Sequence, residues 1–253
     1  MGGGTADPYR GLVYHRSALV RASRYSAWII DCGQSRESQK RAPHVKLLVA
    51  RHAECEKNLV GIPGGPGAAL TPTGRLEAEL LAENIRSFDR LPDQVIACPT
   101  AQTIETAQIL ATALDVPMTI GDELKSIHLG VLAGVPIVEA RRLYPTSSKS
   151  MDEWRAGEIE LCDVDIDGME DPRSFYGRGI HYLLECTGEQ RVNLIVATTS
   201  ILILLQNLFD MKGPERGEGY RVRHYENAQL IELNFSPTQI DWLKQQAERY
   251  EGI

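Results

Sequence analysis

Residues 45–52, with the sequence VKLLVARH, place an almost continuous apolar run directly before an Arg-His pair. Such a run without polar alternation is typical of a strand that is buried on both faces of a parallel sheet. In sheets of this kind, the side chains just beyond the carboxyl ends of the strands border the crevice that binds ligands. At such an edge Arg51 could bind an anion and His52 could act as a nucleophile or acid/base group. The alternative is a surface arginine beside a structural histidine.

Strand and helix patterns alternate after this run. Further strands are predicted at residues 94–98, 193–198 and 229–235, and helices at residues 101–114 and from residue 201 to 209. Thr71 and Pro72 begin another helix as N-cap and first residue, and its expected apolar face comprises Leu76, Leu80, Leu81, Ile85 and Phe88. Strands separated by helices predict the α/β fold class, with a mostly parallel central sheet and helices on both faces. Residues 121–170 have the least regular pattern and are expected to form an irregular insert over the sheet edge.

Composition and charge narrow the function classes. The chain has 253 residues, of which 43% are hydrophobic and 24% charged, as in an ordinary globular protein. Its net charge of -7 argues against a nucleic-acid partner, because phosphate backbones select basic surfaces. The longest wholly apolar run, residues 201–205, is too short to span a membrane. The five cysteines are widely spaced without a CxxC pair, which favours reduced thiols and argues against a zinc site.

Residues 1–44 differ in composition from the rest of the chain. No acidic residue lies between Asp7 and Asp31, whereas arginine, serine and small residues recur there. An organelle transit peptide has this composition, and so does a poorly ordered extension or a start codon assigned too far upstream. We favour the second interpretation. The expected organisation is an N-terminal extension followed by an α/β domain at residues 45–253, in a cytoplasmic protein.

The order of short motifs from residue 45 to 235 resembles the histidine phosphatase superfamily, the phosphoglycerate-mutase-like proteins. Residues 51–54, RHAE, are similar to the Arg-His-Gly-Glu box of that family, and Asn58 falls where the family has an asparagine. Residues 70–74, LTPTG, resemble its first helix start, and residues 97–107 resemble its SSPL.RA.QTA segment. Residues 194–197, LIVA, are similar to the strand that ends in the second histidine of the family. The resemblance implies the same α/β fold.

The resemblance also implies which catalytic groups this chain has lost. In the family, two arginines and two histidines hold the phosphoryl group, and a carboxyl group protonates the leaving oxygen. Arg51 and His52 match the first arginine and the nucleophilic histidine. Neutral side chains stand at the other positions: Gln102 for the second arginine, Ser126 for the acid, Thr198 for the second histidine and Thr199 for the glycine after it. Because phosphoryl transfer depends on electrostatic stabilisation, strong phosphatase activity is not expected.

Other residues could replace the lost groups. His128 lies two residues after Ser126 and could donate a proton near neutral pH, although an exposed loop histidine is an equal alternative. Arg141, Arg142 and Arg155 could supply positive charge from the insert, but surface solvation is the usual state of such residues.

Three hypotheses follow, in order of preference. The first is a degenerate family member that binds an anionic or phosphorylated small molecule, or a protein partner, without efficient phosphate hydrolysis. The second is a repurposed enzyme that uses His52 as an acid/base group for isomerisation or dehydration. The third is a slow phosphatase or mutase that works through phosphorylated His52. None of these implies a metal or organic cofactor, and a homo-oligomer is compatible with all three.

Overall fold

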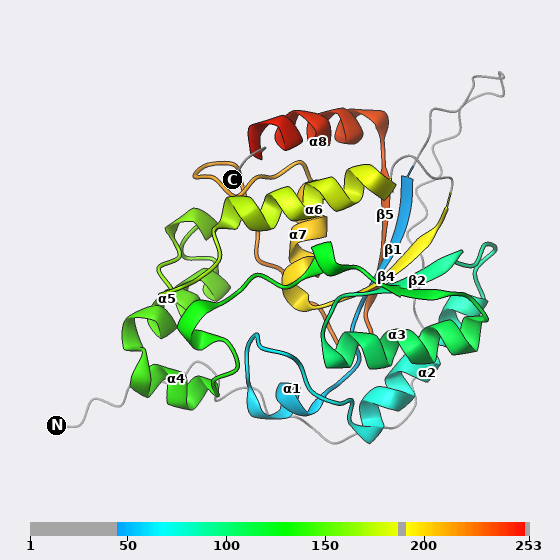
Figure 1. The fold of residues 1–253 in the computed structure, drawn as a ribbon, viewed down its shortest axis with the longest axis horizontal. Coiled ribbons are helices and arrows are strands. Elements are labelled where there is room, and N and C mark those ends of the chain that lie inside the picture. The colour runs from blue at the N-terminus through cyan, green and yellow to red at the C-terminus, as the bar shows by residue number, and fades with distance from the viewer. Residues whose placement is uncertain (1–44, 187–190, 251–253) are drawn as a thin grey trace. The chain divides into compact units, whose positions relative to one another are not determined.

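A five-stranded sheet organises the computed structural model, which describes residues 45–186 and 191–250 (Figure 1). The strands lie in the order β3-β2-β4-β1-β5, with bounds β1 Val45–Arg51, β2 Gln94–Ala97, β3 Met118–Ile120, β4 Asn193–Ala197 and β5 Leu230–Phe235. Strands β1 to β4 run parallel, and β5 pairs with β1 in the antiparallel direction. The α/β fold class with a mostly parallel sheet is therefore confirmed. The predictions for residues 1–44 lie outside the described residues.

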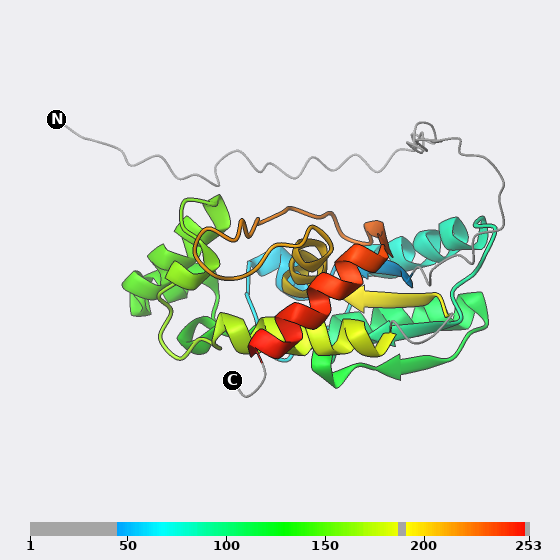
Figure 2. The same cartoon turned by 90° about the horizontal axis from the view of Figure 1, so that it is seen from above.

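Helices cover both faces of the sheet. On one face, α2 and α3 pack against inward side chains of β1, β2 and β4. On the other face, α6, α7 and α8 form a larger core with the alternate residues of the same strands. Helix α8 packs against α6, as the view from above shows (Figure 2). The bounds are α2 Pro72–Arg86, α3 Ala101–Leu114, α6 Pro172–Cys186, α7 Thr199–Phe209 and α8 Pro237–Tyr250. Burial on both faces explains the apolar runs of the strands.

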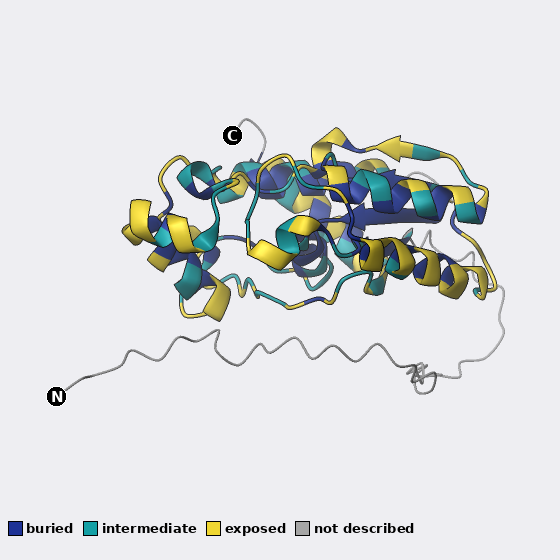
Figure 3. Cartoon of the chain, turned by 90° about the horizontal axis from the view of Figure 1, so that it is seen from below, coloured by how far each residue is buried: buried dark blue, intermediate teal, exposed yellow. Residues whose placement is uncertain are grey.

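Helix α2 begins as the sequence predicts but buries a different face. The Thr71 hydroxyl caps it by accepting a hydrogen bond from the Gly74 amide at 3.0 Å. Leu76 and Leu80, expected in the apolar face, are 60% and 64% exposed, so that part of the prediction is wrong. The buried stripe recurs at helical spacing and is built mainly from small residues, namely Gly74, Ala78, Leu81, Ala82 and Ile85. Small side chains let α2 approach its neighbours closely, since a Cβ at Gly74 would lie 2.0 Å from the Glu54 carbonyl oxygen, and the outer face of the helix is exposed (Figure 3).

Residues 121–170 contain more regular structure than their sequence pattern suggests. They form helices α4 and α5 and three short 3-10 helices, with bounds α4 Ile137–Leu143, α5 Pro145–Ala156, η1 Asp122–Leu124, η2 Gly130–Leu132 and η3 Leu161–Asp163. Short α1, Glu56–Val60, follows β1 directly. The Ile137 amide donates to the Gly61 carbonyl at 3.2 Å, so the start of α4 touches the loop after α1.

None of the helices in the described ranges has the length and apolar character that a membrane span requires. The four cysteines in these ranges are free thiols, as the spacing predicts. The cytoplasmic location stays a prediction.

Candidate functional site

The carboxyl ends of β1, β4 and β2 meet at one edge of the sheet, where sheets of this kind bind ligands, and this edge is called the crevice here. The His52 amide donates to the Ala197 carbonyl at 3.0 Å, which fixes the end of β1 beside the end of β4. The Cys98 amide donates to Val196 at 3.0 Å and fixes the end of β2 on the other side. The residues just past these strands, from which the sequence predicted the site, therefore lie side by side.

His52 is buried and neutral. Its side chain is only 5% exposed, and Nδ1 lies 2.8 Å from the Ala53 carbonyl oxygen. Because a carbonyl oxygen only accepts hydrogen bonds, Nδ1 carries the proton and Nε2 keeps its lone pair. The pKa of His52 is lowered to about 4, chiefly by burial and also by the positive charges of Arg51 and Lys57, against the opposing hydrogen bond to Ala53. At neutral pH the imidazole is therefore uncharged, and Nε2 can accept a hydrogen bond.

The Arg51 side chain is held by a backbone carbonyl oxygen. Its Nη1 donates to the Tyr225 carbonyl at 2.6 Å. Glu77 accepts a hydrogen bond from the Glu54 amide at 2.8 Å, and Glu54 in turn accepts one from the Thr71 hydroxyl at 2.6 Å. Burial raises the pKa of Glu77, whereas the Arg51 charge lowers it. These contacts orient the segment that follows β1.

The two substituted positions 126 and 198 are in direct contact. The Ser126 Oγ lies 2.7 Å from the Thr198 Oγ1, which lies 3.3 Å from the Ser200 Oγ. Thr198 is the N-cap residue of α7, yet its hydroxyl makes no capping hydrogen bond. Thr199, the first residue of α7, is half-buried. The start of α7 thus presents its amide groups, the positive end of the helix dipole, next to a row of neutral hydroxyls.

Two further residues predicted to bind a ligand, Gln102 and Asn58, accept hydrogen bonds from backbone amides of the protein itself. Gln102 is buried, and its Oε1 accepts a hydrogen bond from the Ala68 amide at 3.2 Å. The Asn58 Oδ1 accepts from the Cys55 amide at 3.0 Å and so completes a capping box at α1. Ligand binding by Asn58, Gln102 and Thr199 stays a prediction.

His128 lies at a small cleft beside this row of hydroxyls. The cleft, named here the Ser126 cleft, has a volume of about 190 Å³ and is lined by Gly64, Gly65, Pro99, Thr100, Lys125, Ser126, Ile127, His128, Leu129 and Ala133. The exposed His128 ring accepts a hydrogen bond from the Gly130 amide at Nδ1, over 3.1 Å. The structure therefore brings His128 and Ser126 to one cleft, as their spacing in the sequence suggested.

Lys57 was not among the cations that the sequence suggested as replacements for the second arginine. We looked for a replacement cation among the insert arginines, but Arg141 pairs with Asp152 at 3.0 Å and Arg142 with Glu139 at 3.8 Å. Lys57 instead acts electrostatically on His52 and donates from Nζ to the Gly64 carbonyl. In the sequence, Lys57 lies five residues after His52, and the glycine-rich stretch GIPGGPG follows at residues 61–67. This combination could have indicated a cation held at the site by a glycine loop.

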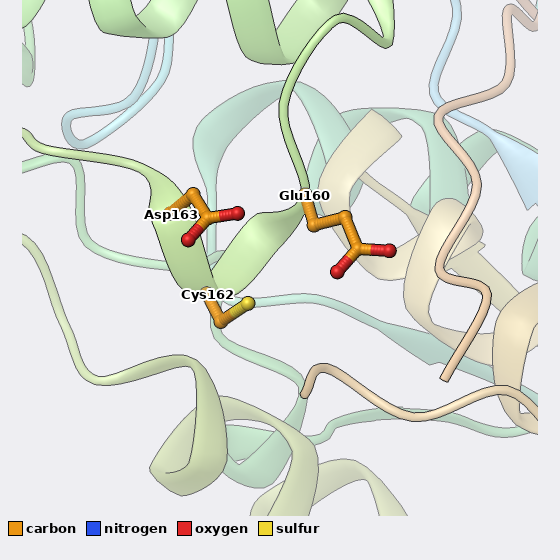
Figure 4. A group of neighbouring side chains, drawn as sticks. All are labelled: Glu160, Cys162 and Asp163. Carbon is orange, nitrogen blue, oxygen red and sulfur yellow. The ribbon is translucent and has the colours of Figure 1, made fainter. Parts of the chain in front are cut away.

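A separate group of acidic and thiol side chains lies at η3. Glu160, Cys162 and Asp163 come close enough together to hold a metal ion (Figure 4). Asp163 pairs with Arg216, however, and Glu160 accepts a hydrogen bond from the Gly217 amide at 2.8 Å. Both carboxylates already have partners, so this group carries no metal assignment.

Comparison with known proteins identifies the family to which this chain belongs. The family model of the histidine phosphatase superfamily (branch 1) matches residues 47–247. Phosphoserine phosphatase 1 of Hydrogenobacter thermophilus is 28% identical over 166 residues, which cover 65% of this chain and 74% of that protein.

Solved structures share the fold at low sequence identity. Phosphoserine phosphatase of Entamoeba histolytica, in complex with 3-phosphoglyceric acid, superposes with a TM-score of 0.58 at 19% identity, covering 77% of this chain and 98% of that chain. A mycobacterial glucosyl-3-phosphoglycerate phosphatase in complex with VO3 superposes with a TM-score of 0.63 at 17% identity, covering 77% and 93%. Because the family model spans most of the chain, the protein belongs to the histidine phosphatase superfamily, branch 1.

Proposed function

We propose that this protein binds an anionic or phosphorylated small molecule in the crevice and does not hydrolyse phosphate esters efficiently. The observation that carries the proposal is the division of the crevice into two halves. The half at the end of β1 keeps a cation and a neutral imidazole, Arg51 and His52. The other half offers neutral hydroxyls, with Ser126 and Thr198 2.7 Å apart, and the lysine that lines its cleft, Lys125, has a side chain that is 61% exposed.

The neutral half supports binding better than catalysis. A phosphoryl transition state spreads negative charge over its oxygens and is stabilised mainly by cations and positioned donors. Losing one such donor typically costs a factor of about 10² or more in rate, and losing the general acid costs roughly another 10²–10⁴. Hydroxyls and the open amides of α7 still donate hydrogen bonds to an oxyanion in its ground state. Ligand affinity is therefore reduced less than turnover.

The relatives indicate the class of ligand. A phosphoserine phosphatase of this fold is solved with 3-phosphoglyceric acid, and another phosphatase with VO3. Those ligands belong to those proteins. For this chain we infer a small molecule with one phosphate or carboxylate group for the Arg51 side, and a polar remainder for the Ser126 cleft.

Slow phosphoryl transfer through His52 is the second candidate. The fixed Nδ1–H tautomer favours it, because Nε2 keeps the lone pair that attack on phosphorus requires. The same state counts against the repurposed enzyme, since a histidine with a pKa of about 4 is unprotonated at Nε2 at neutral pH and is also a weak base. We therefore place slow phosphoryl transfer ahead of acid/base chemistry, which reverses the order that the sequence favoured.

Two measurements test the proposal. Titration calorimetry with inorganic phosphate and orthovanadate measures binding, and a panel of phosphomonoesters that includes phosphoserine and 3-phosphoglycerate measures phosphate release. We expect binding that Arg51→Gln abolishes, without turnover at an ordinary enzymatic rate. Ordinary turnover that His52→Ala abolishes would overturn the proposal. A phosphohistidine at position 52, trapped with a reactive phosphate donor while turnover stays slow, would favour the second candidate.

A further inference from the structure

Lys57 is held at the crevice by the glycine loop, residues 61–67. Its Nζ donates to the Gly64 carbonyl, and a side chain at Gly65 would begin 3.6 Å from the same nitrogen. Gly64 and Gly65 both adopt left-handed backbone conformations, with φ of 59° and 73°, and both line the Ser126 cleft. The lysine therefore lies against the two glycines that line this cleft, and its charge acts on His52.

The charge of Lys57 has no counter-ion in the described part of the chain. It makes no ion pair there, and its hydrogen-bond acceptor is a neutral carbonyl oxygen. The side chain is half-buried, and burial lowers the pKa of its ammonium group. Arg141, Arg173 and Arg178, by contrast, each have a carboxylate partner. Desolvating a cation without a counter-ion costs free energy, which an anionic ligand would offset.

Gln102 fixes the loop that holds Lys57. Its Oε1 accepts from the Ala68 amide, and a Cβ at Gly67 would collide with that oxygen. The Ala101 amide also donates to the Pro66 carbonyl at 3.3 Å, so the start of α3 is fastened to the loop at two points. The residue at the second arginine position is thus used to hold the backbone, and its neutral amide suits that task.

We infer that Lys57 supplies the second cation of the anion site, held beside His52 by the glycine loop that Gln102 anchors. The inference rests on the proposed anion binding and deepens it. Together, Arg51 and Lys57 would hold an oxyanion from two sides, at the mouth of the Ser126 cleft. The shared chemistry is a phosphate or a carboxylate group on a small molecule.

The test compares binding of inorganic phosphate and of acetate, by titration calorimetry, across four variants. Lys57→Gln should weaken binding of the preferred anion by about tenfold or more, as expected for a lost charge-assisted hydrogen bond. Lys57→Arg should keep most of the affinity because it keeps the charge. Lys244→Gln is the matched control and should bind as the wild type, since Lys244 lies on α8, outside the lining of the cleft, and its side chain is 61% exposed. Arg51→Gln reports on the proposed site itself.

A second readout separates the charge of Lys57 from support of the loop. NMR titration of the His52 ring should show a higher pKa in Lys57→Gln and little change in Lys57→Arg, because only the first removes a neighbouring positive charge. Unchanged anion affinity in Lys57→Gln, with loss in Arg51→Gln, would overturn the inference and leave the proposed function standing. An unchanged His52 titration would overturn it as well. If the wild type binds neither phosphate nor acetate, the proposed function falls first.

Discussion

The two halves of the crevice are built on the same scaffold with different chemistry. At the end of β1, Arg51 and His52 are fixed by hydrogen bonds to Tyr225 and Ala53. At the ends of β2 and β4, the Gln102 amide and the Thr198 hydroxyl are also fixed, by Ala68 and Ser126. Both halves are held by hydrogen bonds, but the side chains fixed in the first half include a cation, whereas those fixed in the second are neutral.

This difference separates the positions of the side chains, which the fold determines, from their charges, which it does not. Sheet register and helix starts place the side chains at positions 52, 102 and 198. Catalysis needs the charge in addition, because a cation adds Coulombic attraction to the hydrogen bond that a neutral donor also makes with an oxyanion. The predictions below act on one half or the other.

Restoring charge to the neutral half should have the largest effect. We expect Gln102→Arg, Ser126→Glu and Thr198→His together to raise phosphate release from phosphomonoesters by about 10²–10⁴ over the wild type. His52→Ala in the restored protein is the control and should remove the gain. A folded triple variant that stays inactive would contradict the placement of these positions around His52. The variant with only Ser126→Glu and Thr198→His leaves the Gln102–Ala68 contact intact and shows whether the glycine loop limits the gain.

Acid should destabilise the charged half through His52. The pKa of His52 is about 4 in the folded protein, against 6.5 for an unperturbed histidine. Between these values the unfolded chain binds the proton and the folded protein does not, so stability falls as the pH drops from 6.5 to about 4. The loss attributable to His52 is about 3 kcal/mol. Urea unfolding across this range should show it in the wild type and not in His52→Gln. His224→Gln, at a histidine with an 85% exposed side chain, should behave as the wild type.

A substitution at Gly67 should disrupt the contacts that hold the glycine loop against the start of α3. This residue has φ of 101°, and an added Cβ would meet Gln102 Oε1 and lie 2.6 Å from the Ala101 nitrogen. Gly157 also has a positive φ, 74°, but a Cβ there meets nothing within 4 Å. We expect Gly67→Ala to lower the free energy of unfolding by about 1–3 kcal/mol more than Gly157→Ala, because only the first adds overpacking to backbone strain. Equal losses would mean that Gln102 does not hold the loop.

Much of the scaffold could be predicted from sequence because its signals are local. The apolar runs of β1 and β4 and the Thr71-Pro72 start of α2 each specify their element within a few residues. The buried face of α2 could not be predicted in the same way. Leu76 and Leu80 are more hydrophobic than Gly74 and Ala78, but close approach to the neighbouring elements selects the smaller residues.

The same distinction between local signals and contacts from distant segments applies to the site. Strand ends alone were enough to identify Arg51, His52 and Thr198 as neighbours in space. Lys57 was missed because its position depends on a loop that returns to the crevice through four left-handed glycines, and nothing local to the lysine signals that path. The structure likewise shows Gln102 facing the Ala68 amide, a contact across 34 residues of sequence.

The contact within the neutral half gives the smallest expected effect and the most direct test of its geometry. Ser126→Ala and Thr198→Val each remove one partner of the 2.7 Å hydroxyl contact. In a double-mutant cycle followed by urea unfolding, we expect a coupling free energy of about 1 kcal/mol. A control cycle pairs Ser126→Ala with Ser236→Ala, whose hydroxyl contacts Gln239, and should be additive. If the first cycle is additive as well, the two hydroxyls do not share a hydrogen bond in solution. Each would then be free to face the ligand, and the neutral half would be a set of independent donors.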